Sequence, residues 1–140
     1  EYDRVLQYVE REGADFCSAE STVFPFDHTE VGQLLGERWN FSPELLDVIR
    51  RHHASWGELE YSASSLSLPV IVKSADTIAH ALAFGHPPAL TRFRVRAEKK
   101  LDEVWQILGI PHAQRRGTLE QFRARVDEEF ELYEKPAASS

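Results

Sequence analysis

Apolar residues recur along the chain every three or four positions, and no stretch alternates with the two-residue period of a strand. The spacing from Tyr2 to Val9 predicts an opening helix that ends near Gly13. A second helix is predicted to start after Asp27, because Asp27 and Glu30 form a capping box. Its apolar stripe, which we expect to face the core, consists of Val31, Leu34, Leu35 and Trp39.

Two helices are predicted in the middle of the chain. A cap followed by proline at residues 42–43 begins the first, which is expected to reach Trp56. The second begins at Pro69 and stops at Gly85, after a polar connector over residues 62–67. Small side chains cover most of its faces, so neighbouring helices can approach closely and it is expected to be the central helix.

Two more helices complete the prediction. Apolar spacing from Ala97 to Leu108 predicts a helix that Gly109 closes. Thr118 and Gln121 form another capping box before a last helix. The predicted fold class is therefore all-α, a bundle of five to six helices.

The length of the chain bounds its domain organisation. A chain of 140 residues can form one ordinary domain with a core but hardly two, and 42% hydrophobic residues argue against disorder. We expect one domain over residues 1–135 and a frayed tail at 136–140. Because the chain starts at Glu1 and contains no methionine, we expect it to be a fragment of a larger protein or a processed chain.

The charge and the cysteine content limit the compartments and partners that we expect for the protein. The lone Cys17 fits a reducing compartment, and no apolar stretch is long enough to span a bilayer, so we expect a cytoplasmic protein without membrane contact. Residues 1–70 carry 5 basic and 13 acidic side chains, which disfavours nucleic acid as a partner. The basic cluster at 92–100 is interpreted as a solvated helix end; an adaptor that grips nucleic acid is the weaker alternative.

Four side chains of metal-binding type lie on predicted core-facing helices, and the fold could bring them together: His28, His52, His53 and Asp76. Imidazole and carboxylate converging on one point are typical of hydrolytic metal sites. Each histidine alone is more often a hydrogen-bonded structural residue than a ligand. Asp76 could equally pair with His80, four residues on. Spacing alone leaves both interpretations open.

Two segments resemble a known family: DHTEVGQLLGERWNFSPELLDVIRRHH at 27–53 and SADTIAHAL at 74–82. The ordered set H-x-x-x-G, a Trp-ended helix, H-H and then A-D resembles the HDOD domain of bacterial signalling proteins. That family is a degenerate relative of the HD metal-dependent phosphohydrolases and the HD-GYP cyclic-diguanylate phosphodiesterases. The resemblance covers roughly residues 1–110 and corresponds to the family's C-terminal half. It implies an HD-domain-like fold and vestigial metal ligands at His28, His52, His53 and Asp76.

The chain departs from the catalytic relatives in a way that bears on activity. Those relatives also need an earlier histidine and an adjacent His-Asp pair, whereas no histidine precedes His28 and no His-Asp dipeptide occurs. No G-Y-P motif follows His53. Three imidazoles and one carboxylate could hold one divalent ion, but they lack the carboxylate that would bridge two.

We therefore expect no catalytic residues and no bound cofactor. The expected function is that of a regulatory, signal-transducing domain that contacts other signalling proteins or domains, or a second copy of itself. The alternative is a metal-dependent HD-type phosphohydrolase, similar to the cyclic-dinucleotide phosphodiesterases. That enzyme would bind a divalent metal ion and have its remaining ligands upstream of residue 1.

Overall fold

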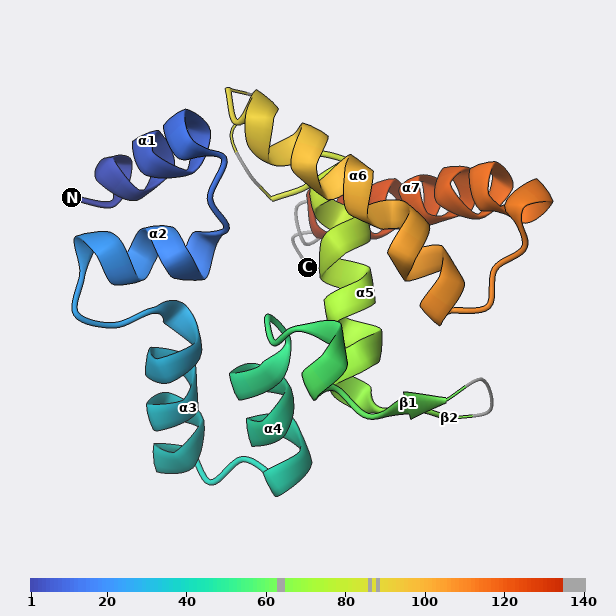
Figure 1. The fold of residues 1–140 in the computed structure, drawn as a ribbon. Helices are drawn as coiled ribbons and strands as arrows, with labels where there is room; N and C mark the ends of the chain where they lie inside the picture. The colour runs from blue at the N-terminus through green and yellow to red at the C-terminus, as the bar shows by residue number, and fades with distance from the viewer. Residues whose placement is uncertain (63–64, 86, 88, 135–140) are drawn as a thin grey trace, which may run out of the picture.

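The computed structural model describes residues 1–62, 65–85, 87 and 89–134. These residues form seven α-helices, one 3₁₀ turn and one hairpin of two short antiparallel strands (Figure 1). In chain order the elements are α1 (Tyr2–Glu12), α2 (Phe16–Val23), α3 (His28–Arg38), α4 (Pro43–Arg51), η1 (Trp56–Glu58), β1 (Tyr61–Ser62), β2 (Ser65–Leu66), α5 (Leu68–Ala81), α6 (Thr91–Ile107) and α7 (His112–Glu134).

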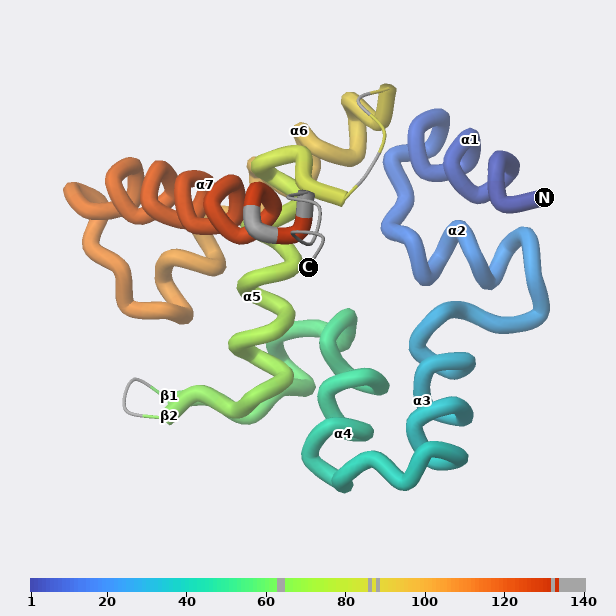
Figure 2. Tube along the Cα trace, turned by 180° about the vertical axis from the view of Figure 1, so that it is seen from behind, coloured from blue at the N-terminus to red at the C-terminus, as the bar shows by residue number. Residues whose placement is uncertain are grey.

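The all-α fold class is confirmed, and α5 occupies the middle of the molecule as expected. Figure 1 shows α5 in the middle, with α1 to α3 on one side, while α6 begins near α1 and crosses α5 toward α7; Figure 2 gives the same arrangement from behind. The helix packs against α4 before it in the chain and α6 after it. Two further contacts, of α1 with α6 and of α2 with α3, connect the N-terminal helices to the rest.

Several helix ends form where the local chemistry predicts. α1 ends at Gly13, whose φ of 64° is a left-handed conformation that favours glycine. α3 begins with the expected capping box: Asp27 accepts from the backbone N–H of Glu30, and Glu30 accepts in return from that of Asp27. Pro43 stands in the first turn of α4 and Ser42 accepts from Leu45 N–H.

Several elements differ from the sequence prediction. α2 was not predicted, and it raises the number of helices above the expected five to six. α4 stops at Arg51, so Trp56 belongs to the separate η1 turn. The predicted polar connector contains the β1–β2 hairpin. α7 starts directly after Pro111, which leaves the predicted start at Thr118 inside the helix. The expected tail at 136–140 lies outside the described residues.

The core consists of two clusters of buried side chains. The first joins α1, α2 and the beginning of α6, with Val5, Val9 and Phe93 at its centre. The second joins α5 to α6 through Ile78 and Trp105. No helix in the described ranges is long and apolar enough to cross a membrane.

The apolar stripe of α3 does not face this core, which corrects the sequence prediction. Leu34 is 67% exposed and Trp39 is 63% exposed, and Val31, Leu35 and Phe41 are also at the surface. The reason is that α3 packs on α4 through its glycines instead. A Cβ at Gly36 would lie 2.7 Å from Leu46 of α4. The large side chains therefore remain on the outer side of the α3–α4 pair.

Candidate functional site

Three of the predicted ligands meet where the start of α3 approaches the end of α4. His28 is the first residue of α3, while His52 and His53 directly follow the last turn of α4. The ring centroid of His28 lies 4.9 Å from that of His53 and 5.6 Å from that of His52. The centroids of His52 and His53 are 4.1 Å apart. The fold thus gathers three imidazoles from two helix ends.

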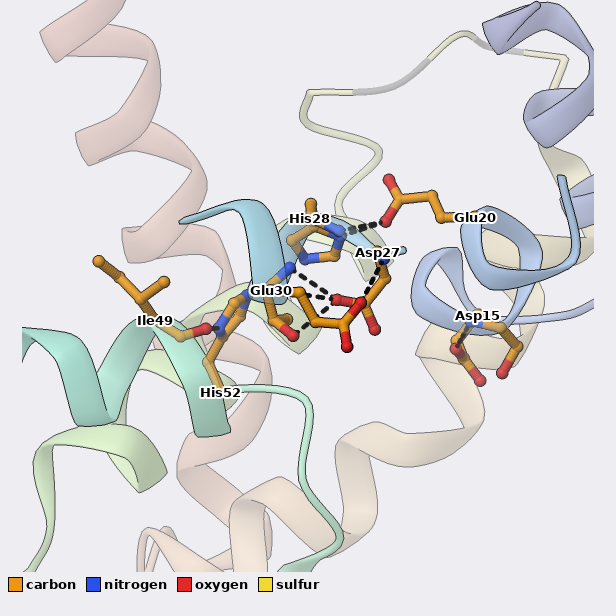
Figure 3. A network of polar contacts seen from close by, with 9 residues as sticks. Asp15, Glu20, Asp27, His28, Glu30, Ile49 and His52 are labelled. Carbon is orange, nitrogen blue, oxygen red and sulfur yellow. Dashed lines mark hydrogen bonds and ion pairs between the residues drawn. The ribbon is translucent and has the colours of Figure 1, made fainter. Parts of the chain in front are cut away.

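Two of these rings are oriented by hydrogen bonds at Nδ1 (Figure 3). His28 Nδ1 lies 2.6 Å from a carboxylate oxygen of Glu20 in α2, and the same oxygen accepts from the backbone N–H of His28 at 2.9 Å. His52 Nδ1 lies 3.1 Å and 3.0 Å from the carbonyl oxygens of Val48 and Ile49. A proton on Nδ1 satisfies these acceptors, and it leaves the lone pair of each ring on Nε2.

A cysteine that the sequence analysis did not select completes this group. Cys17 lies in α2. Its sulfur, one ring nitrogen of His28 and one ring nitrogen of His53 are all within 4.8 Å of one another. Cys17 and Glu20 are three residues apart on one helix, so they share a face. α2 therefore contributes both a ligand-type atom and the carboxylate that orients His28.

The fourth predicted ligand, Asp76, belongs to an adjoining cavity. Its carboxylate pairs with His80 Nε2 at 3.1 Å. This is the pair within one helix that the sequence offered as the alternative to a metal ligand. A cavity of about 60 Å³ between α2, α5 and α6 is lined by His53, Asp76 and His80 together with basic side chains. His53 thus borders both the cysteine–histidine group and the cavity.

Burial and neighbouring charges set the protonation states. Burial, helped by the nearby imidazole of His52, lowers the pKa of His53 to about 4, although Asp76 acts in the opposite direction. Burial raises the pKa of Asp76, but the hydrogen bond and charge of His80 outweigh it and hold that pKa below the usual value. At neutral pH His53 is a neutral imidazole beside an ionised carboxylate.

The thiol is held protonated by its surroundings. Burial and the negative charges of Asp27, Asp15, Glu20 and Asp76 raise the pKa of Cys17 to about 12. A free thiolate is therefore scarce near pH 7. The same carboxylates create a negative potential that attracts a cation, and a bound cation would displace the thiol proton.

The donors fit one metal ion and do not fit a bridged pair. One ion needs three or four convergent donors, which the thiol and the imidazoles can supply. A bridged pair needs a carboxylate between the two ions. Among the described residues, the carboxylates near the imidazoles already have partners: Glu20 binds His28 Nδ1, Asp76 binds His80, and Asp27 caps α3. We therefore derive no two-metal chemistry from this arrangement.

Two arginines of the basic cluster at 92–100 join α6 to α1 and the residue that ends it. Arg92 donates to the carbonyl of Arg11 at 2.7 Å, and its backbone N–H donates to Glu10. Arg96 donates to the carbonyl of Gly13. Arg94 pairs with Glu98, as the interpretation of a balanced helix end predicts, whereas the contacts of Arg92 and Arg96 with the α1 region were not predicted.

Comparison with protein families supports the HDOD resemblance over the N-terminal part of the chain. Residues 1–55 match the family model of the HDOD domain, so the recognition is confirmed for this segment. The match is shorter than the expected 1–110, and its N-terminal placement differs from the expected C-terminal half. It contains Cys17, His28, His52 and His53, whereas Asp76 lies beyond it. No curated protein and no solved structure gives a significant match.

Proposed function

We propose that this chain is a non-catalytic regulatory domain that transmits a signal through contacts with other signalling proteins. The observation that carries the proposal is the engagement of Glu20 and Asp76 with His28 and His80. Hydrolysis at an HD-type centre requires a metal-activated hydroxide, and none of the described carboxylates near the imidazoles is free to bridge two ions for it. The sequence also contains no His-Asp dipeptide.

The outer surface of the α3–α4 pair supports the role in protein contacts. Leu34, Trp39 and Leu45 are large apolar side chains that are exposed by 67%, 63% and 41%. The Trp39 and Phe41 rings lie together, 5.9 Å between centroids. Exposed apolar surface of this kind marks interaction sites, and tryptophan is enriched at their energetic centres.

Turnover measurements on metal-loaded protein test the absence of catalysis. The chain is incubated with Mn²⁺, Fe²⁺ or Zn²⁺ and assayed against a cyclic dinucleotide and a chromogenic phosphodiester. We expect the same background rate for the wild type and for His52→Ala, because the site lacks the means to activate water. Metal-dependent turnover that His52→Ala abolishes would overturn the proposal.

One observation favours the competing function, an HD-type phosphohydrolase. The cavity beside His53 is lined by Lys73, Arg96 and Lys100, which could attract a phosphate. Burial and the charge of Lys100 lower the pKa of Lys73, so an anion between the two would relieve their repulsion. In the same assay, a loss of turnover in Lys73→Ala as well as in His52→Ala would support this function.

A further inference from the structure

We propose that Cys17, His28 and His53 form a binding site for one zinc-type transition-metal ion. The site is distinct from the ligand set implied by the HDOD resemblance, because the thiolate of α2 takes part and Asp76 does not. It joins α2 to the facing ends of α3 and α4. The proposal does not rest on the proposed regulatory function.

The distances between the three donors are close to those of a formed site. The sulfur and the two ring nitrogens all lie within 4.8 Å of one another. In a tetrahedral zinc site, bonds of about 2.0–2.3 Å place neighbouring donors roughly 3.3–3.7 Å apart. A contraction of at most about 1.5 Å between any two donors therefore completes the site. Side-chain rotations can supply it, since all three residues are only partly buried.

The surroundings prepare the donors for a cation. Glu20 is 7% exposed and binds His28 Nδ1, the carboxylate–histidine arrangement that fixes a ligating ring with its Nε2 lone pair available. His53 makes no hydrogen bond with any residue that the structure describes, so its ring nitrogens are available for a metal. The ring centroid of His52 lies 4.1 Å from that of His53, so His52 is a further imidazole beside the three donors.

The donor set determines the class of ion. One thiolate and two imidazoles are soft or borderline ligands that favour Zn²⁺, Co²⁺ or Ni²⁺. Mg²⁺ and Ca²⁺ prefer oxygen donors, and the nearby carboxylates already have partners: Glu20 and Asp76 bind histidines, while Asp15 and Asp27 cap the starts of α2 and α3. Binding releases the thiol proton, so affinity is expected to rise with pH.

Cobalt substitution reports directly on the thiolate. The chain is purified, stripped with EDTA and titrated with Co²⁺, and the absorption spectrum is recorded. We expect one Co²⁺ per chain, a near-ultraviolet thiolate-to-cobalt charge-transfer band and the intense visible bands of tetrahedral cobalt. Zn²⁺ should displace the cobalt and abolish both.

Three variants locate the site, and His112→Asn serves as the matched control because His112 is exposed at the start of α7. Cys17→Ser should abolish the charge-transfer band, and His53→Asn should weaken Co²⁺ binding at least 10-fold. Glu20→Gln, which removes the carboxylate that orients His28 and its negative charge near Cys17, should weaken it roughly 10–100-fold. His112→Asn should bind as the wild type does. Circular dichroism of each apo variant confirms that it folds.

Two outcomes would overturn the site. Wild-type protein that shows no charge-transfer band with saturating Co²⁺ has no thiolate ligand. Binding that survives Cys17→Ser unchanged but is lost in Asp76→Asn would assign the metal to the ligand set of the HD relatives. Phosphodiester turnover by the loaded wild type would contradict the regulatory function and leave this site intact, so the two proposals fail separately.

Discussion

His53 is the residue whose protonation the fold opposes most clearly. Its pKa in the folded protein, about 4, lies below the ordinary value of 6.5, chiefly because the ring is buried. As the pH falls, the unfolded chain takes up this proton first. The contribution of His53 to stability is therefore complete above pH 6.5 and is lost as the pH falls toward 4.

Replacing His53 with glutamine should remove part of the acid sensitivity. In urea unfolding with EDTA present, we expect the wild type to lose about 1–2 kcal/mol more than His53→Gln between pH 7 and pH 4.5, a figure already reduced for the partial exposure of the ring. NMR titration gives the direct measurement. A His53 ring signal with a midpoint near 6.5 would contradict the prediction.

Glu20 is the second residue whose role can be isolated. Its buried carboxylate accepts from both the backbone N–H and Nδ1 of His28, so it joins α2 to α3. Glu20→Gln removes the negative charge from a charge-assisted hydrogen bond and should lower the free energy of unfolding by about 1–3 kcal/mol at pH 7. Glu120→Gln, which loses only an exposed ion pair with Arg116, should change it by less than about 0.5 kcal/mol. Equal losses in the two variants would show that the Glu20 contact is unimportant.

At the scale of elements, the α3–α4 contact depends on glycine. A Cβ at Gly36 would lie 2.7 Å from Leu46 and 3.1 Å from Phe41, so two side chains would have to shift at once. We expect Gly36→Ala to lower the free energy of unfolding by about 1–2 kcal/mol. This is the net loss: the cost of overpacking should exceed the gain of about 1 kcal/mol that the helix propensity of alanine contributes.

Gly117→Ala is the matched control for this contact. Gly117 also lies inside a helix, α7, but a Cβ there would meet nothing within 4 Å. Only the higher helix propensity of alanine then affects the stability, and the variant should be more stable than the wild type by up to about 1 kcal/mol. Thermal unfolding of the two variants side by side separates packing from propensity. A stabilising Gly36→Ala would refute close packing of α3 on α4.

Elements with strong end signals could be predicted from the sequence, and those without them could not. The capping box at Asp27 and the proline at residue 43 fix the starts of α3 and α4 locally, before any tertiary contact. α2 has only eight residues, and a single side-chain cap from Asp15 marks its start. A helix this short is stabilised mainly by the helices it contacts, so its own sequence carries little periodic signal.

At the scale of the whole molecule, the difference between local signals and tertiary packing explains which residues of the site could be predicted. His28, His52 and His53 could be selected because their spacing matches a family pattern and the helices that carry them are well marked. Cys17 could not, because its place beside them depends on how α2 packs against α3. Asp76 was placed on the correct helix, yet a pair with His80 inside that helix competes with a shared site. Which residues form a helix can be predicted from the local sequence, whereas which side chains come together depends on how the helices pack.

The outer surface of α3 and α4 gives the last prediction, which concerns assembly. Leu34 and Trp39 are about two-thirds exposed, and a contact with a second copy that covers both would remove this apolar area from water. We expect sedimentation equilibrium to show concentration-dependent dimers. Added salt should strengthen them, because each chain carries a net charge of −7.

The double variant Leu34→Glu/Trp39→Glu should be monomeric at every concentration, with a free energy of unfolding within about 0.5 kcal/mol of the wild type, since both side chains are exposed. Phe130→Glu is the matched control, because Phe130 is 57% exposed on α7, away from this face. It should leave the dimer intact. If Phe130→Glu instead produces monomers, the contact belongs to α7. A wild type that is monomeric at every concentration would contradict the predicted dimer, and the exposed surface would then be available to a different protein.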